Sequence, residues 1–228
     1  MEEDKRSWIV RENGKRDKPE AYDEYPHPDA EHVSFHLEAG APERGKLRAE
    51  IDEPQGKETL VDNYSFDGEA LARAEWTKHR LIYVSETLRQ PVHISGTPRI
   101  SVKLSSDQKA ANLSVWVVSL PWNTRKDAKI TDNIITRGWA DPQNYKSMSK
   151  SKPLKPGKFY KVDFDLQPDD QIIPKGQQIA LMIFSSDQEF TLWPKPGTEL
   201  TIDLDETSLS LPIVGGEPAW EDALSDDS

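Results

Sequence analysis

Three neighbouring segments indicate the fold most clearly: ITRGWADPQNYKS at residues 135–147, SKPLKPGKFYKVDFDLQ at 151–167 and QIALMIFSSDQEFTLWP at 178–194. Proline and glycine turns separate its strand-like parts. In KVDFDL, apolar residues alternate with aspartates, which predicts a strand with one buried and one wet face. ALMIF is apolar throughout, which predicts a central strand that is covered on both faces.

Further strand-like segments lie on both sides of this stretch. RLIYVS, PVHIS, PRISVKLSS and NLSVWVVSL precede it from Arg80 onward, and ELTIDLD and SLSLPIV follow it. Helical patterns are too sparse between these segments to supply parallel crossovers. The sequence therefore predicts an all-β fold, a two-sheet antiparallel jelly-roll sandwich with long loops and little helix. The predicted buried residues include Trp116, Phe164, Leu181, Ile183 and Leu204.

The first third of the chain is more polar and carries only short apolar islands. HVSFHL at residues 32–37 alternates with period two, as a strand with one buried face does. A short helix is predicted over 67–76, where Asp67 can cap and Trp76 extends an apolar stripe. These patterns predict three parts: an entry segment with the first strands at 1–45, the jelly-roll domain at 46–216, and an acidic, disordered tail at 217–228.

Charge and composition restrict the partners of the chain. The formal net charge is -11, which opposes binding to nucleic acid or to anionic membranes. The sequence has no cysteine, so it cannot form a disulfide or a thiolate metal site, and this composition agrees with a reducing cytoplasm. It contains no apolar run of about 20 residues, and its start, MEEDKRSW, does not resemble a signal peptide. We expect a soluble cytoplasmic protein with neither nucleic acid nor membrane as partner.

No catalytic motif is evident. A serine nucleophile of an α/β-hydrolase would lie in a G-x-S-x-G turn, which this sequence does not contain. The serine pairs at 105–106 and 185–186 both precede Asp-Gln, and this context favours turn and capping roles. His32 and His36 share a predicted strand face, but four residues of strand separate them by about 13 Å. We predict no catalytic residue, no metal site and no cofactor in this chain.

Aromatic residues near predicted loops are the best candidates for a binding surface. These residues lie beside Pro, Asn or Asp, whereas Trp116 lies within an apolar strand and is predicted to be in the core. Exposed aromatic faces stack on sugar rings in carbohydrate-binding modules, but amphipathic aromatics near loops more often form protein interfaces. The candidates for an interface or a ligand-binding face are Trp122, Trp139, Tyr145 and Trp193.

The order of several short motifs resembles the C-terminal, non-catalytic sandwich domain of the X-prolyl dipeptidyl-peptidase family and its esterase and acylase relatives. The resemblance covers about residues 80–214, and its specificity lies in the order of the motifs rather than in any single one. The phrase TLWP followed by SLSLPIV is more similar to the peptidase branch. The matching motifs are Leu88–Pro91, Gly96–Pro98, Ser105–Asp107, Arg137–Trp139, Leu154–Gly157 and Lys175–Asp187.

This resemblance implies a galactose-binding-like jelly roll attached to an α/β-hydrolase domain. A Ser-His-Asp triad of that domain would cleave dipeptides with proline in second position from peptide N-termini. No triad motif matches a position here, and the family's catalytic histidine precedes the sandwich. We therefore expect a fragment of a serine exopeptidase: a non-catalytic accessory domain that packs on an upstream hydrolase domain of the same polypeptide and that either helps to shape the entrance of that domain or serves a contact between copies in a homo-oligomer. The alternatives are an independent carbohydrate-binding module and a structural or interaction domain.

Overall fold

The computed structural model describes residues 7–11, 20–22, 24–147, 149–192 and 196–225. The helical elements are α1 (Gly68–Arg73), α2 (Gly216–Leu224) and the 3-10 turns η1 (Ile130–Asp132) and η2 (Pro142–Asn144). The strands are β1 (Ser7–Arg11), β2 (Glu20–Tyr22), β3 (Ala30–Glu38), β4 (Gly45–Arg48), β5 (Lys57–Val61), β6 (Arg80–Val84), β7 (Val92–Gly96), β8 (Arg99–Ser106), β9 (Leu113–Leu120), β10 (Ile134–Ala140), β11 (Phe159–Asp165), β12 (Asp169–Ile173), β13 (Gln178–Phe184) and β14 (Glu199–Val214). The predicted all-β class is confirmed.

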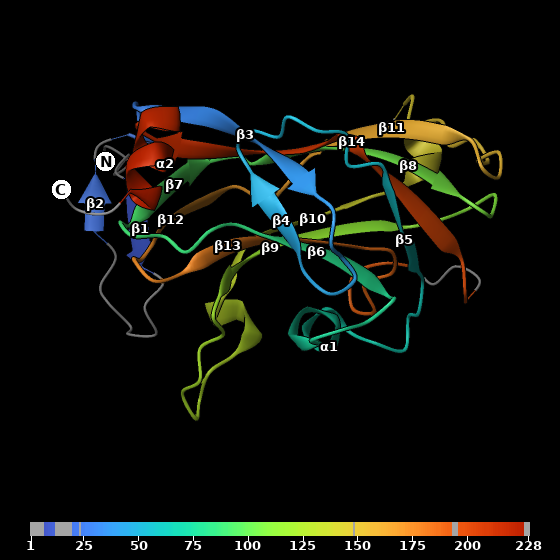
Figure 1. Ribbon diagram of the computed structural model, residues 1–228, viewed down its shortest axis with the longest axis horizontal. Coiled ribbons are helices and arrows are strands. Elements are labelled where there is room, and N and C mark those ends of the chain that lie inside the picture. The colour runs from blue at the N-terminus through green and yellow to red at the C-terminus, as the bar shows by residue number, and fades with distance from the viewer. Residues whose placement is uncertain (1–6, 12–19, 23, 148, 193–195, 226–228) are drawn as a thin grey trace, which may run out of the picture.

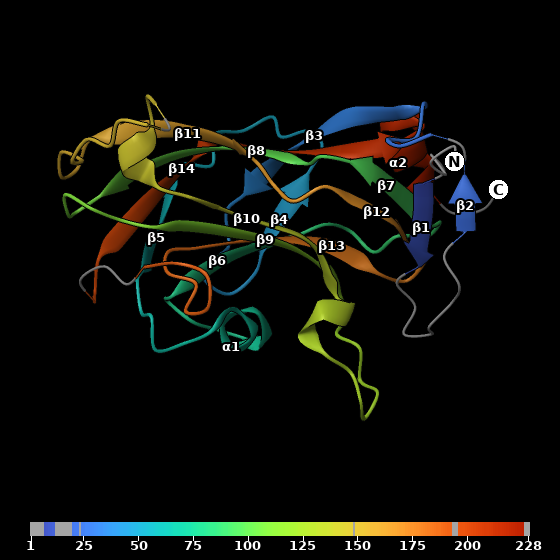
Figure 2. The ribbon, with the colours of Figure 1, turned by 180° about the vertical axis from the view of Figure 1, so that it is seen from behind.

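The strands form two facing layers that are joined along one side (Figure 1). One layer has the order β10, β9, β13, β6, and β4 and β3 carry the hydrogen bonding over to β14 in the other layer. There β8 lies between β14 and β11, and β5 and β7 also pair with β14. Most pairs are antiparallel, whereas β4 pairs parallel to β6 and β1 pairs parallel to β12. The result is a barrel-like sandwich, seen from behind in Figure 2.

The main core fills the space between the two layers. Its side chains come from alternate positions along each strand, as the pleat of a strand requires. In β3 the predicted pattern is confirmed, because Val33, Phe35 and Leu37 are buried between exposed or half-buried neighbours. Across the sandwich, Leu181 and Ile183 of β13 are fully buried in the same cluster. Each such side chain contributes about 1.5–3 kcal/mol by leaving water.

A second apolar cluster covers the outer side of the layer formed by β6, β13, β9 and β10. Trp116, Met182 and Phe184 point to this side, where Leu71 and Ala72 of α1 pack on them. Both views show α1 lying against this layer, outside the sandwich (Figures 1 and 2). The core on one side and α1 on the other explain why ALMIF has no polar position, so the prediction of a doubly covered strand is confirmed.

The C-terminal segment differs from its prediction. Instead of a disordered tail over 217–228, residues 216–224 form α2, which packs against β3. Trp220 is buried and meets the ring of Phe35 edge-on at 4.8 Å. Ala223 is also buried, three residues further along the helix. Acidic side chains occupy the outer face of α2. Because they make the segment acidic overall, its composition predicted a disordered tail and not a helix with a buried stripe.

Three other predictions needed correction. The predicted helix begins with Asp67 as cap but ends at Arg73, and Trp76 is 60% exposed rather than part of its apolar stripe. ELTIDLD and SLSLPIV form the single strand β14, with a shift of register between Asp203 and Ser208 where it passes β8. Phe164 is half-buried at the margin of the core, while the other predicted core residues are buried: Trp116, Leu181, Ile183 and Leu204.

Candidate interaction face

The four predicted surface aromatics do not form one cluster. Trp122 follows β9 and packs against the second cluster, with the Arg73 guanidinium 5.0 Å from its ring centre. Trp139 lies on β10, on the same outer side of that layer. Tyr145 follows η2 and packs instead on Tyr160 and the main core, with ring centres 4.5 Å apart. Trp193 lies outside the described residues.

Helix α1 is held on the sheet by close contact and by hydrogen bonds at both ends. At its start the Asp67 carboxylate accepts the Ala70 N–H at 2.7 Å. Gly68 lies so near the Trp116 indole that a Cβ there would be 2.2 Å from a ring carbon. Past the C-terminal end, the Arg80 guanidinium donates to the carbonyl groups of Leu71 and Ala74. Burial lowers the pKa of Arg80 to about 10.

Two tryptophans on neighbouring strands share one carboxylate. The indole Nε1–H of Trp116 donates to Asp187 Oδ2 at 3.1 Å, and that of Trp139 donates to the same oxygen at 3.0 Å. Asp187 is the third residue of the SSDQ segment after β13 and is only 1% exposed. Its other oxygen, Oδ1, is buried and has no hydrogen-bond partner in the described part of the chain. The two rings are thus fixed by a buried anion at their N–H edges.

The Arg137 cation lies over the rings of this cluster. The Arg137 guanidinium carbon is 5.4 Å from the ring centre of Trp116, 5.6 Å from that of Trp139 and 4.9 Å from that of Phe190. These distances are within the range of cation–π attraction. The ring of Phe190 also stacks on Trp139, with centres 4.7 Å apart and planes 25° apart.

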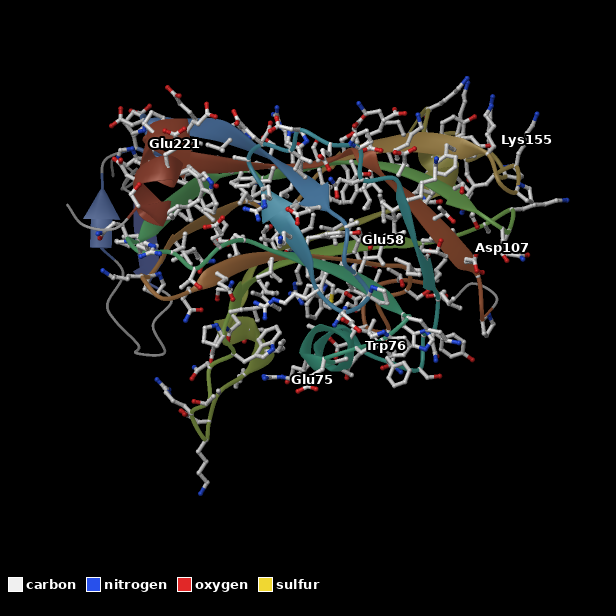
Figure 3. The ribbon with its side chains drawn as sticks, viewed as in Figure 1. Glu58, Glu75, Trp76, Asp107, Lys155 and Glu221 are labelled. Atoms are coloured by element: carbon white, nitrogen blue, oxygen red, sulfur yellow. The ribbon has the colours of Figure 1, made fainter. Side chains whose placement is uncertain are left out.

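Large apolar side chains project into solvent from the turn after β13 and from the segments beside α1. Leu192 is 89% exposed and Phe190 48%, both in the turn after β13, while Trp76 and Phe66 flank α1. Figure 3 shows Trp76 beside α1. We call this surface the α1 face: the outer side of β6, β13, β9 and β10 together with α1 and residues 187–192. Apolar groups gathered in this way are typical of surfaces that contact another protein.

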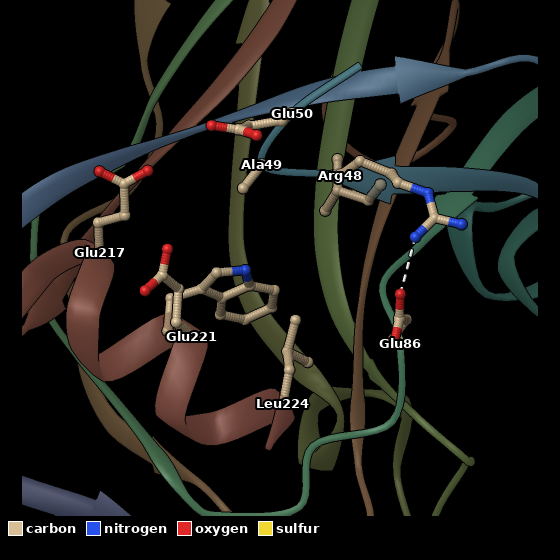
Figure 4. A pocket seen from close by; sticks show the side chains of 9 residues that line it. Arg48, Ala49, Glu50, Glu86, Glu217, Glu221 and Leu224 are labelled. Carbon is tan, nitrogen blue, oxygen red and sulfur yellow. Dashed lines mark hydrogen bonds and ion pairs between the residues drawn. The ribbon is translucent and has the colours of Figure 1, made fainter. Parts of the chain in front are cut away.

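A separate pocket lies between α2 and β4 (Figure 4). Its walls carry the carboxylates Glu50, Glu217 and Glu221, and Arg48 at its edge is paired with Glu86 at 2.7 Å. Trp220 lines the pocket but is only 2% exposed, so it offers no free ring face for a sugar.

The serine pairs serve the structure. The Ser185 hydroxyl donates to the Asn112 carbonyl at 3.1 Å, and Ser186 gives both its N–H and its hydroxyl to the Asp62 carboxylate. The Ser106 hydroxyl accepts the Gln108 N–H at 3.0 Å. These bonds agree with the predicted turn and capping roles.

One histidine–carboxylate pair was missed from the sequence. His93 of β7 and Asp170 of β12 are 2.8 Å apart, as the register of the two strands allows. Ser95, two residues further on β7, is fully buried and its hydroxyl accepts the His27 N–H at 2.8 Å. A buried hydroxyl held in this way cannot meet a substrate. Among the described residues no group of three or more metal-binding side chains is found.

The described helices include none that is long and apolar enough to cross a membrane.

The fold and the α1 face define the class of this protein: an all-β, barrel-like sandwich domain that exposes apolar and aromatic side chains on one outer face. The chain belongs to the family of X-Pro dipeptidyl-peptidase C-terminal non-catalytic domains, whose family model matches residues 2–221. The resemblance drawn from the order of the motifs is therefore confirmed.

A curated relative agrees with this membership. A protein of Rhodopirellula baltica with the name "Putative Xaa-Pro dipeptidyl-peptidase" is 63% identical over 217 residues, which are 95% of this chain and 34% of that protein. The chain thus spans about a third of the length of that relative.

Solved structures show the same fold at low identity. An aminopeptidase from a marine sediment Thaumarchaeota archaeon matches 86% of this chain and 39% of its own, with a TM-score of 0.65 and 14% identity. A CocE/NonD family hydrolase from Staphylococcus aureus matches 92% of this chain and 41% of its own, with a TM-score of 0.65 and 11% identity.

Proposed function

We propose that this chain is the accessory domain of an X-Pro dipeptidyl-peptidase-type serine hydrolase and that it docks on the α/β-hydrolase domain through the α1 face. The exposed apolar side chains of that face carry the proposal, because Leu192 at 89% and Trp76 at 60% exposure are costly to leave in water. The parent activity, removal of X-Pro dipeptides from peptide N-termini, is part of the proposal. A galactose-binding-like jelly-roll topology and a cytoplasmic location are also part of the proposal. The absence of cysteine from the sequence supports the cytoplasmic location.

The composition of the α1 face supports a protein partner. Tryptophan and arginine are the residues that most often dominate binding energy at interfaces, and the face carries Trp139, Trp122 and Arg137. A carbohydrate-binding role is less well supported, because the Trp139 ring already stacks on Phe190. Self-association through the same apolar side chains is the second candidate function. Sedimentation of the isolated chain would detect it, and Leu192→Ser should then shift dimer to monomer.

A chimera tests the docking proposal. The matching third of the Rhodopirellula baltica relative is replaced by this chain, which its 63% identity makes feasible. Amide hydrogen exchange is then compared between the chimera and the isolated chain. We expect the amides of α1 and of residues 187–192 to exchange on the order of tenfold more slowly in the chimera, because docking suppresses local opening. The amides of β11, which lies beside β8 in the opposite layer of the sandwich, should exchange equally in both.

Two substitutions and one control sharpen this test. Trp76→Ser and Leu192→Ser remove exposed apolar surface, so each should change the stability of the isolated chain by no more than about 0.5 kcal/mol. In the chimera each substitution should partly restore fast hydrogen exchange to the amides of α1 and of residues 187–192. Tyr25→Ser also removes an exposed aromatic, 43% exposed, but on the segment that borders β7; it should leave the protection intact. Equal exchange of the α1 face in chimera and isolated chain would contradict docking through this face.

A further inference from the structure

Arg137 is a charged side chain whose hydrogen-bond donors have no acceptor in the described part of the chain. It is half-buried, and its Nε atom is fully buried without a partner. No ion pair joins it to Asp187, although both residues contact Trp116 and Trp139. Buried donors in folded proteins are almost always satisfied, so an orphaned one in a guanidinium needs a physical explanation.

The surrounding rings hold the guanidinium in place but cannot satisfy it. Attraction by a ring face offsets part of the charge, yet it supplies no acceptor for an N–H group. Asp187 strengthens this attraction, because an anion at the N–H edges of the two indoles pushes electron density toward their faces. Its Oδ2 is already occupied by both indoles. The arrangement thus fixes a cation at the surface and leaves its donors unused.

The position of Arg137 indicates where the missing acceptor comes from. Phe190, whose ring lies 4.9 Å from the guanidinium carbon, is 48% exposed, so the cluster lies at the surface of the α1 face. A partner that covered the exposed apolar side chains would also cover Arg137 and would bury its charge. A buried charge needs an opposite charge, and a carboxylate fits the planar fork of a guanidinium best.

We propose that Arg137 is the charged anchor of the α1 face and that it pairs with a carboxylate side chain of the catalytic domain. This inference rests on the docking proposed above and adds its chemistry: an aromatic rim around one desolvated ion pair. Such a pair fixes the orientation of two docked surfaces, because only one register brings the carboxylate to the guanidinium. A polyanion such as RNA is a poor alternative, since the chain has a net charge of -11.

The test compares Arg137→Gln and Arg137→Lys in two proteins, the isolated chain and the chimera described above. In the isolated chain both variants should melt within a few degrees of wild type, because the guanidinium has no acceptor to lose. In the chimera, Arg137→Gln should reduce the protection of the α1 face on the order of tenfold or more, as expected when one partner of an interface charge pair is left alone. The protection of the α1 face with Arg137→Lys should lie between that of wild type and that of Arg137→Gln, since lysine keeps the charge but not the planar fork of donors.

Salt and a control variant separate charge pairing from packing. Raising the salt concentration should weaken the protection in the wild-type chimera and should have a smaller effect in Arg137→Gln, because salt screens charges. Lys155→Gln removes one positive charge from an exposed side chain near β11 (Figure 3) and should change nothing.

Three results would contradict the pairing of Arg137 with a carboxylate of the catalytic domain. Equal destabilisation of both proteins by Arg137→Gln would show a packing residue and would overturn the inference. Unchanged protection in the variant chimera would also overturn it while leaving the docking proposal intact. A wild-type chimera without added protection would remove the docking proposal and this inference together.

Discussion

At the scale of single residues, the link between Trp116 and Trp139 is the feature that the sequence could not reveal. The apolar context of Trp116 predicted a core position correctly, and the loop context of Trp139 predicted a surface position that is half-buried. Their common partner Asp187 lies 48 residues beyond Trp139, and no periodicity connects the two. Local patterns predict which face of a strand a residue occupies, but not which distant polar group it meets.

Asp169 provides a prediction about pH. Burial raises the pKa of its carboxyl to about 6 from an ordinary 3.8, although the side-chain amide of Gln171 opposes the shift. The folded state therefore binds a proton more tightly than the unfolded state. The stability that this group contributes is present below about pH 4 and is lost as the pH rises through about 6, by up to about 3 kcal/mol. Asp169→Asn should stabilise the chain at pH 7.5 and should have a smaller effect at pH 4.5.

Thermal unfolding followed by circular dichroism at both pH values measures this difference. Asp163→Asn is the matched control, because Asp163 is an exposed aspartate on β11. A melting temperature that Asp169→Asn changes equally at pH 4.5 and pH 7.5 would contradict the assigned cause.

At the scale of elements, the errors arose where tertiary packing overrode a local pattern. The strands with clear alternation, such as β3 and β11, occur where they were predicted. Helix α2 was missed because its apolar stripe is narrow, and a helix so short is stabilised only by packing, here on β3, β14 and β7. The long strand β14 was predicted as two segments, because the polar residues at its change of register resemble a turn.

Gly68 gives a prediction for helix α1. Replacing glycine by alanine within a helix normally stabilises a protein by roughly 0.5–1 kcal/mol. Here the added methyl group would overlap the Trp116 ring, with a carbon 2.2 Å away. Gly68→Ala should therefore destabilise the chain, typically by about 1–3 kcal/mol, as overpacking does. Chemical denaturation measures the change, and Glu69→Ala on the half-buried neighbour should have a smaller effect. A stabilised Gly68→Ala variant would show that α1 does not rest on Trp116.

At the scale of the whole molecule, the sequence predicted the sandwich but not how its layers join. Hydrophobic alternation and turn residues are local, and they were sufficient for the all-β class and for most strands. The join through β4 depends on a parallel pairing with β6 across a long separation in sequence, which no local signal announces. The α1 face was likewise beyond prediction as a unit, because β10, the turn after β13 and α1 meet only in the folded chain.

The isolated chain should not hydrolyse an X-Pro substrate by itself. His93 and Asp170 form the pairing that a general base needs, but Ser95 on the same strand is fully buried with its hydroxyl on the His27 N–H. A nucleophile must be reachable and must lie beside oxyanion donors. We expect no release of chromophore from a Gly-Pro amide by the purified isolated chain and measurable release by the chimera. Turnover by the isolated chain that persisted through purification and disappeared in His93→Gln would reverse this conclusion, because it would assign the reaction to the His93–Asp170 pair.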